Sequence, residues 1–272
     1  MTNAVPPLAE LVRAALAIRR RFLAMHYEAR SGHVGSGLSA IDLLTYLYAA
    51  WLRPIDRFIL SKGHGASSLY ATLHHFGHLS EAELATYYKD DTLLPAHPAP
   101  RGVAAIPAAT GSLGHGLPIA AGMAHSYKHL RATGARVACL LSDGECNEGS
   151  TWEAALFAGH HQLDNLTVLV DANGIQGFGR TEDVLTLEPF AKKWEAFGFE
   201  VRECNGHDFA ALQAVLSEPP SGRPHCVIAR TIKGKGISFM ENLVEWHYWP
   251  MNEAQYAAAV AELDRTESEL GR

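Results

Sequence analysis

Two stretches decide how this chain folds, and they are Ser142-Asp143-Gly144-Glu145-Cys146-Asn147-Glu148-Gly149 and Asp171-Ala172-Asn173. Each comes at the end of a short apolar run, Val137 to Leu141 for the first and Leu166 to Val170 for the second. The residues between the two runs, 150–163, have the pattern of a helix. A strand, a helix and a strand in succession form a parallel β-α-β unit, so both stretches should emerge at the same carboxyl edge of a sheet.

This arrangement places Asp143 and Asn173 on neighbouring strand ends. A carboxylate and an amide oxygen suit a hard cation such as Mg²⁺, which keeps other coordination positions open for water and phosphate oxygens. Gly144 has no side chain, so the backbone there can approach a bound anion closely. An Asp-Gly pair is also common in ordinary turns. The metal interpretation therefore depends on Asn173 lying beside Asp143.

The rest of the chain continues the alternation of helices and strands. Helices are predicted over 8–29, 41–52, 66–76, 117–133, 189–197, 209–216 and 253–270, and strands over 57–60, 199–204 and 226–231. Capping boxes are expected at Ser80 with Glu83 and at Ser150 with Glu153, and Asn252 should cap the last helix. The pattern predicts an α/β fold with a mainly parallel sheet and helices on both faces.

Composition narrows the class of protein. The chain has 272 residues, of which 47% are hydrophobic, and neither a linker nor a repeat divides it, so a single domain over 1–272 is expected. A net charge of −6 argues against nucleic-acid binding. The sequence contains neither an apolar run that could span a membrane nor a secretory signal. The four cysteines lack the spacing of zinc sites, and the predicted buried thiols Cys139 and Cys226 fit a reducing, cytoplasmic location.

Four further segments are rich in glycine and histidine, and they are Ser31-Gly32-His33-Val34-Gly35-Ser36-Gly37, Leu60-Ser61-Lys62-Gly63-His64, Thr110-Gly111-Ser112-Leu113-Gly114-His115-Gly116 and Trp246-His247. In this order, together with Asp143-Gly144 and Asn173, they resemble the signature segments of the thiamine-diphosphate-binding amino-terminal domain of transketolases. The resemblance spans nearly the whole chain. It implies that the chain binds thiamine diphosphate through Mg²⁺, or through Ca²⁺ or Mn²⁺ in its place.

The resemblance also implies roles for individual residues. The metal ligands would be Asp143, Asn173 and the backbone carbonyl of Ile175. The cofactor would contact His64, Gly111, Leu113, Gly144, the amide of Glu145, Asn173 and His247. The catalytic residues would be the histidines of the motif loops, His33, His64, His97 and His247, because an imidazole with a pKa near neutrality can exchange protons with sugar hydroxyls or donate to phosphate. Packing or surface roles are expected for the histidines on predicted helices or their ends, which are His26, His74, His75, His78, His125, His129, His160 and His161.

The activity implied by the resemblance is transfer of a two-carbon ketol unit from a ketose donor to an aldehyde acceptor. In this family the glutamate that activates the cofactor belongs to a second, pyrimidine-binding domain, and no motif of this chain supplies it. The chain is therefore expected to be the amino-terminal subunit of a two-chain enzyme that is inactive alone. Its partner would be a carboxyl-terminal transketolase-like subunit in an α2β2 heterotetramer, with Glu148 facing the partner's activating glutamate.

Three residues depart from the family pattern: Ser142 and Tyr248 stand where Gly is usual, and His115 stands where Gln is usual. His115 and Tyr248 are expected close to the site, so they bear on the substrate more than on the cofactor. Two alternatives stay open. One is the α subunit of a thiamine-dependent 2-oxo-acid dehydrogenase or decarboxylase, although the segments 31–33 and 60–64 are of the transketolase type. The other is a non-catalytic partner subunit, although Asp143, Asn173 and the loop histidines are all present.

Overall fold

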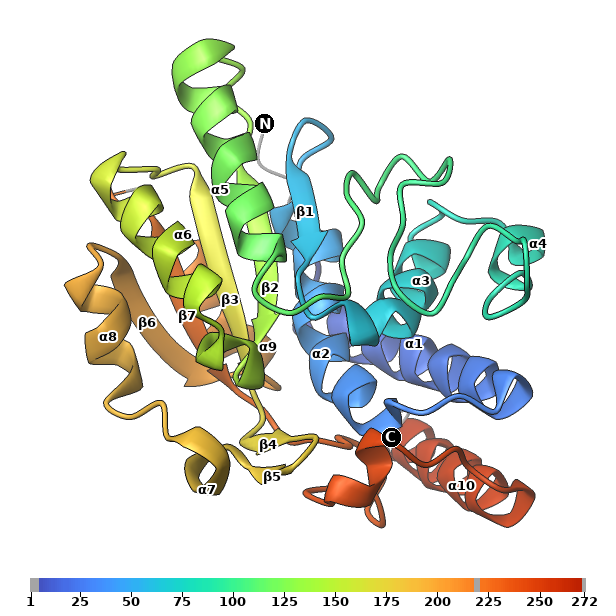
Figure 1. Cartoon of the computed structure of the whole chain (residues 1–272). Coiled ribbons are helices and arrows are strands. Elements are labelled where there is room, and N and C mark those ends of the chain that lie inside the picture. Colours follow the sequence, from blue (N-terminus) through green and yellow to red (C-terminus); the bar gives the residue numbers. More distant parts are fainter. Residues whose placement is uncertain (1–4, 218–220, 271–272) are drawn as a thin grey trace.

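A five-stranded parallel sheet forms the centre of the computed structural model, which describes residues 5–217 and 221–270 (Figure 1). The strands lie in the order β1 (Arg57–Leu60), β2 (Val137–Ser142), β3 (Leu166–Ala172), β7 (His225–Arg230) and β6 (Glu200–Asn205). The register of β2 and β3 pairs Ser142 with Asp171, so both strands end at the same edge. The predicted parallel β-α-β unit and its common carboxyl edge are confirmed.

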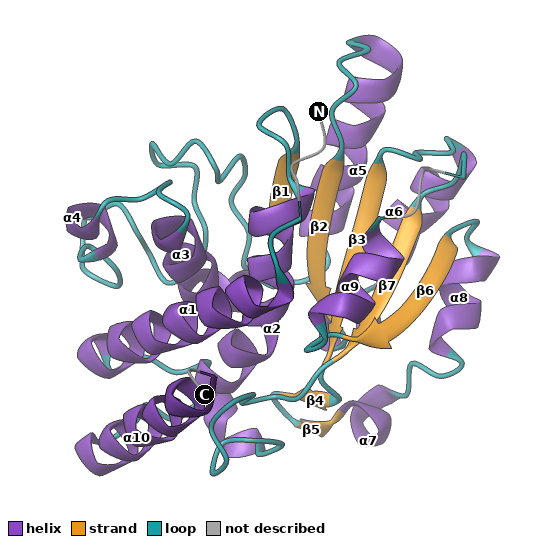
Figure 2. Ribbon diagram, turned by 180° about the vertical axis from the view of Figure 1, so that it is seen from behind, coloured by secondary structure: helices purple, strands orange, loops and turns teal. Residues whose placement is uncertain are grey.

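Helices cover both faces of this sheet, as predicted (Figures 1 and 2). One side holds α1 (Leu8–Ala29), α2 (Val34–Tyr46), α3 (Ala66–His75), α9 (Phe209–Leu216) and, packed on α1, α10 (Glu253–Leu270). The other side holds α5 (Gly116–His125), α6 (Gly149–His160) and α8 (Phe190–Ala196). Two short helices, α4 (Glu81–Leu84) and α7 (Thr181–Leu185), lie in the connections.

The central strands are apolar on both faces because each face packs on helices. On β2, Ala138 and Leu140 belong to the core that contains α1 and α2, whereas Cys139 and Leu141 belong to the core that contains α5 and α6. The thiols of Cys139 and Cys226 are buried, as the strand pattern predicted. The continuous apolar runs in the sequence therefore reflect a sheet covered on both sides.

The start of α2 differs from the prediction. The helix begins at Val34, directly after His33 with its positive φ of 65°, and not near residue 41. Its glycines read as a loop because glycine has a low helix propensity. They are needed for packing, since a Cβ on Gly37 would lie 2.3 Å from the Phe22 ring. The helix continues as the π-helical turn η1 (Leu47–Trp51), which matches the predicted end.

The helix predicted over 117–133 also has different bounds, because α5 ends at His125 and continues as the π-helical turn η3 (Ser126–Leu130). The capping box expected at Ser150 with Glu153 is wrong. Glu148 is the N-cap residue of α6, and the Ser150 hydroxyl donates to the Gly114 carbonyl at 2.8 Å instead.

The other predicted caps are present. Ser80 forms a capping box with Glu83. The Asn252 side chain accepts from the Gln255 amide at 2.9 Å at the start of α10.

Two loops complete the carboxyl edge of the sheet. The glycine-rich loop after β3 contains a short antiparallel hairpin, β4 (Ile175–Gln176) and β5 (Gly179–Arg180), which the sequence did not predict. The segment 94–109 is irregular. Short 3-10 turns follow β1, β2 and the last long loop, and they are η2 (Gly63–Gly65), η4 (Gly144–Asn147) and η5 (Val244–His247).

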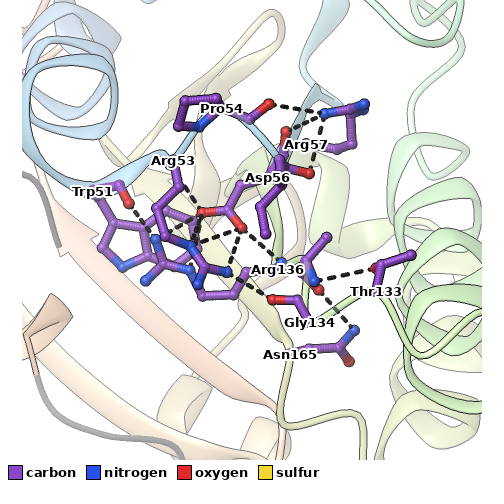
Figure 3. Close-up of polar contacts among 11 residues, drawn as sticks. Trp51, Arg53, Pro54, Asp56, Arg57, Thr133, Gly134, Arg136 and Asn165 are labelled. Carbon is purple, nitrogen blue, oxygen red and sulfur yellow. Dashed lines mark hydrogen bonds and ion pairs between the residues drawn. The ribbon is translucent and has the colours of Figure 1, made fainter. Parts of the chain in front are cut away.

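The opposite, amino edge of the sheet is held by ion pairs around Asp56 (Figure 3). Asp56 accepts from Arg53 and Arg136, each at 2.8 Å, and the Arg136 guanidinium lies 3.8 Å from the centre of the Trp51 ring. Burial opposes ionisation, but the hydrogen bonds from the two arginines outweigh it and lower the pKa of Asp56 to about 2. In the described part of the chain, none of the helices has the length and apolar character needed to cross a membrane.

Candidate active site

A cavity of about 590 Å³ lies at the carboxyl edge of the sheet. Ten of the residues predicted as site residues line it, and they are His33, His64, His97, Gly111, Leu113, Asp143, Gly144, Asn173, Ile175 and His247. They come from seven separate parts of the sequence. The fold therefore brings the candidate ligands and the candidate catalytic histidines to one place.

Asp143 is buried at the end of β2, and backbone groups fix its carboxylate. The Gly144 amide donates to Oδ1 at 2.8 Å, and the Gly174 amide donates to Oδ2 at 2.7 Å. The Thr181 hydroxyl donates to Oδ2 at 3.1 Å. Burial and the nearby charge of Asp171 raise the pKa of Asp143 despite these hydrogen bonds. A cation beside this carboxylate would reverse that effect.

Asn173 is the first residue of the loop after β3, and both polar atoms of its side-chain amide form hydrogen bonds. Its Oδ1 accepts from the Ile175 amide at 3.1 Å, and its Nδ2 donates to the Ser39 hydroxyl at 3.4 Å. Because Gly174, the residue between Asn173 and Ile175, donates to Asp143, the three predicted ligand residues share one small network. A carboxylate, an amide oxygen and a main-chain carbonyl are hard oxygen donors, which fits Mg²⁺ or Ca²⁺.

Residues 5–217 and 221–270 contain no group of three or more His, Cys, Asp or Glu side chains suited to a metal ion. The predicted ligand set has only one such side chain, Asp143. A site of this composition depends on further oxygen ligands from a bound anion and from water, as Mg²⁺ sites commonly do.

Two buried lysines lie next to the candidate ligands. Lys233 is fully buried, and its Nζ donates to the Ile175 carbonyl at 3.1 Å and to His247 Nδ1 at 3.0 Å. Burial and the neighbouring charge of Lys62 lower the pKa of Lys233 to about 8. Within the described part of the chain Lys233 forms no ion pair with a carboxylate, so an anion bound in the cavity would provide the missing counter-charge.

Lys62 differs from Lys233 because it has a carboxylate partner. Its Nζ lies 2.5 Å from Asp171 Oδ2, and both side chains are fully buried. The same Nζ donates to the Ser36 carbonyl at 2.9 Å. The pair therefore connects the loop after β1 to α2 and to β3.

Histidine rings form one wall of the cavity. The centre of the His33 ring lies 5.4 Å from that of His64 and 4.9 Å from that of His247. His97 lies opposite Gly111, where a Cβ would be 3.0 Å from His97 Cδ2. The left-handed φ of 148° at Gly111 likewise requires glycine.

All four histidines are held in their neutral form. Burial is the main cause in each case, and the charges of Lys62 and Lys233 add to it for His33, His64 and His247. The pKa of His33 is lowered to about 4 and that of His247 to about 3. Neutral imidazoles can both accept and donate a proton, so this wall is suited to proton exchange with a substrate hydroxyl.

Two buried polar atoms of the cavity wall have no hydrogen-bond partner among the described residues. They are His33 Nδ1 and the Ser36 hydroxyl. An unpaired buried polar atom is costly unless a bound molecule satisfies it. Their position in the cavity wall indicates contacts with a ligand.

Glu145 is the one predicted site residue that does not line the cavity. Its side chain is fully buried and accepts from the Ser61 hydroxyl and, at 2.8 Å, from the Gly114 amide. Its own amide, which was expected to face the cofactor, donates to the Ser142 hydroxyl at 3.2 Å. In this structure Glu145 connects three motif loops behind the cavity wall.

The residues that depart from the family pattern lie in different surroundings. Ser142 and Tyr248 line the cavity. His115 does not: it is exposed at the start of α5, with Nδ1 within 3.1 Å of the Leu113 carbonyl. His115 therefore lies next to a residue of the cavity wall without lining the cavity itself. Glu148, which was expected to face a partner chain, lines the cavity and is exposed.

Sequence reasoning gave no role to Lys62, Asp171 or Lys233. Lys233 could have been found from its position, because it follows β7 at the same carboxyl edge and stands directly before Gly234. A lysine beside glycine after a strand is compatible with an exposed loop as well. Only the fold shows that its ammonium group is buried against the Ile175 carbonyl.

Known proteins resemble this chain in sequence and in fold. The thiamine diphosphate binding domain of transketolase matches residues 12–267. The chain is 43% identical over 250 residues to a subunit of the apulose-4-phosphate transketolase of Actinobacillus succinogenes, covering 88% of this chain and 90% of that protein. It is 38% identical over 247 residues to a subunit of the 6-deoxy-6-sulfo-D-fructose transketolase of a Clostridium species, covering 86% of this chain and 89% of that protein.

Among solved structures, the fold is similar to a transketolase from Leishmania mexicana, with a TM-score of 0.83 and 26% sequence identity. The match covers 96% of this chain and 45% of that transketolase. This chain thus spans about half the length of the solved transketolase, whereas it spans most of the two relatives named above.

Proposed function

The chain belongs to the transketolase family, whose thiamine diphosphate binding domain matches residues 12–267, and on this premise we propose that it is the amino-terminal subunit of a two-chain transketolase. The enzyme transfers a two-carbon ketol unit from a ketose donor to an aldehyde acceptor, which makes it a transferase of aldehyde or ketone residues. The observation that carries the proposal is the single cavity lined by Asp143, Asn173, Ile175 and four neutral histidines.

We assign the metal and the cofactor to this cavity. Asp143, Asn173 and the Ile175 carbonyl would hold Mg²⁺, or Ca²⁺ or Mn²⁺ in its place, because all three are hard oxygen donors. Gly144, His64, His247 and the uncompensated ammonium of Lys233 would receive the diphosphate, and Gly111 and Leu113 would contact the rings. When bound, thiamine diphosphate supplies a nucleophilic carbon and an electron sink.

The histidine wall would handle the substrate protons. His33 and His97 would meet the ketose hydroxyls and carbonyl, since His33 Nδ1 is buried and unpaired in the described part of the chain. Neutral imidazole can accept a hydroxyl proton and return it to the acceptor. The anionic cofactor would raise the pKa of His64 and His247 toward neutrality, where proton exchange is most effective.

Exposed apolar residues at the mouth of the cavity support a partner chain. Phe178, Val184 and Leu185 line the cavity, and the Phe178 side chain is 88% exposed. Large exposed apolar side chains beside a site mark an interaction surface. We assign this surface to a carboxyl-terminal subunit with the pyrimidine-binding domain and the activating glutamate, in an α2β2 assembly in which Glu148 faces that glutamate. The Actinobacillus relative is itself named as one subunit of a transketolase, which is consistent with a partner.

The remaining assignments follow from the same premise. We assign the chain to a single domain, in keeping with the family match over residues 12–267, and the enzyme to the cytoplasm, where it acts on ketose and aldose substrates or their phosphates. The α subunit of a 2-oxo-acid dehydrogenase, the alternative enzyme, is less well supported, because the relatives described above are named as transketolases.

The test is a titration of thiamine diphosphate into the chain copurified with its partner subunit, with and without Mg²⁺. Binding should require the metal, and Asp143→Asn should weaken it at least about 100-fold, the upper range for losing a metal-site interaction. Asp164→Asn is the matched control, because Asp164 pairs with Lys128 outside the cavity and should leave affinity unchanged. Uptake independent of Mg²⁺ would contradict the ligand assignment, and a loaded complex that transfers no two-carbon unit would contradict the reaction.

A further inference from the structure

Tyr248 stands directly after η5, and packing fixes its main chain against the His33 loop. The His33 amide donates to the His247 carbonyl at 3.0 Å. A Cβ on Gly32 would lie 2.5 Å from the Tyr248 carbonyl oxygen, so the two main chains are in direct contact. The preceding Trp246 is buried and donates from Nε1 to the Phe239 carbonyl at 3.1 Å. The direction in which the Tyr248 side chain leaves the main chain is therefore set by its neighbours.

The Tyr248 side chain extends from the histidine wall to the β4–β5 hairpin. Its ring centre lies 4.8 Å from that of His247, in an edge-on arrangement. At the other end, a Cβ on Gly177 would lie 2.5 Å from the Tyr248 hydroxyl oxygen. Gly177, His247 and Tyr248 all line the cavity. The phenol thus closes the gap between two walls that a smaller residue would leave open.

The hydroxyl group of Tyr248 is available for a hydrogen bond. It has no hydrogen-bond partner in residues 5–217 and 221–270, and Tyr248 is about half exposed, at 54%. A tyrosine in this position presents an apolar ring to the cavity and a polar group at its mouth. Its contact with Gly177 also makes its position sensitive to any side chain added there.

We propose that Tyr248 is a specificity-determining residue that narrows the cavity between His247 and Gly177, so that small hydroxyaldehydes are accepted over bulkier sugar acceptors. The inference rests on the proposed function, because it concerns the acceptor of the ketol transfer. The physical basis is steric, because a substrate that needs the space occupied by the Tyr248 phenol can bind only with strain. One added methylene in a tightly fitted pocket changes the specificity constant by roughly 10-fold or more.

The experiment measures kcat/KM for glycolaldehyde and for ribose 5-phosphate with one ketose donor, using the two-subunit enzyme loaded with cofactor. Tyr248→Gly should raise the ratio of ribose 5-phosphate to glycolaldehyde at least about 10-fold. Tyr248→Trp, which adds volume at the same position, should lower that ratio. The affinity for thiamine diphosphate is measured for both variants, and kcat/KM is compared at saturating cofactor, because the Tyr248 ring packs on His247. Trp249→Ala is the matched control, because Trp249 is 65% exposed and does not line the cavity, so the ratio should stay at the wild-type value.

Two outcomes overturn the inference. If both Tyr248 variants fold, bind cofactor and keep the acceptor ratio within about twofold of the wild type, the residue does not select the acceptor. If the ratio moves in the opposite direction, the steric basis is wrong. Failure of the proposed function is separate, since then the wild-type enzyme itself would transfer no two-carbon unit to either aldehyde.

Discussion

At the scale of single residues, the ion pair of Lys62 and Asp171 binds the site together. Besides Lys62, Asp171 accepts from the Ser39 hydroxyl at 2.7 Å and from the Thr231 hydroxyl. Burial alone would favour the neutral acid, but the Lys62 charge and these hydrogen bonds outweigh it and lower the pKa of Asp171. The Asp171 carboxylate is therefore charged in the folded protein, and both side chains of the pair are out of contact with water.

A double-mutant cycle tests this pair. Lys62→Met leaves a buried carboxylate without its counter-charge, and Asp171→Asn leaves a buried ammonium, so each should lower the free energy of unfolding by about 3–5 kcal/mol. The double variant should lose clearly less than the sum of the two, because it leaves neither charge unpaired. Urea denaturation measures all four proteins. Additive losses would show that the two charges do not depend on each other.

The same residues show what the sequence could predict. Asp143 and Asn173 were predicted because each follows an apolar run. The sequence therefore showed both an oxygen-bearing side chain and its position at the end of a strand. Lys233 and Lys62 were missed as site groups because a lysine is exposed in most proteins. Their burial depends on contacts with Ile175 and Asp171, which lie far away in the sequence.

At the scale of elements, the predicted strands and helix starts agree with the structure to within one or two residues, except for the start of α2. The apolar runs gave β2 and β3 to within two residues, because both faces of these strands are covered. The start of α2 was missed because Gly35 and Gly37 are helical only through tertiary packing, against Lys233 and Phe22. The helix propensity of a residue does not include contacts with distant parts of the chain, so it cannot predict this helix start.

Two glycines of α5 provide a matched test at this scale. A Cβ on Gly116 would lie 2.2 Å from the Ser61 hydroxyl oxygen and 2.6 Å from its Cα, so Gly116→Ala must displace the loop after β1. We expect it to lower stability by about 1–3 kcal/mol, the usual range for overpacking, and to weaken cofactor binding. A Cβ on Gly122 meets nothing within 4 Å, and Gly122→Ala should stabilise the helix by about 1 kcal/mol.

Thermal unfolding and a thiamine diphosphate titration measure both glycine variants. If the two substitutions changed stability by the same amount, the close contact between α5 and Ser61 would not contribute to the position of the loop after β1. If the Gly116→Ala protein were stable and kept its cofactor affinity, the position of the loop after β1 would not affect cofactor binding.

At the scale of the whole molecule, the carboxyl edge of the sheet carries the candidate site and the amino edge carries the Asp56 ion pairs (Figure 3). The sequence predicted a parallel sheet and one common edge for the motif residues. It did not predict the strand order β1-β2-β3-β7-β6, in which β7 lies between β3 and β6. That order depends on pairings between distant segments, and short apolar runs do not specify their neighbours.

The dependence of stability on pH is a property of the whole molecule. His26 is fully buried, with Nε2 2.7 Å from the Ser67 hydroxyl, and burial lowers its pKa from 6.5 to about 4. Between these two pH values the unfolded chain binds more protons than the folded one, so stability falls as the pH falls. His33, also lowered to about 4, acts in the same direction. The raised pKa values of Asp143 and Glu145 act in the opposite direction, because protonation relieves their burial.

His26 alone is expected to lower the free energy of unfolding, measured with urea, by about 2 kcal/mol between pH 7 and pH 5. His26→Gln should flatten this dependence, even if the variant is less stable at pH 7. His78→Gln is the matched control, because His78 is exposed and its loss should leave the slope unchanged. If His26→Gln kept the full slope, the titrating group would lie elsewhere, and the histidine wall of the cavity would be the next group to replace, starting with His33, whose Nδ1 is buried without a partner among the described residues.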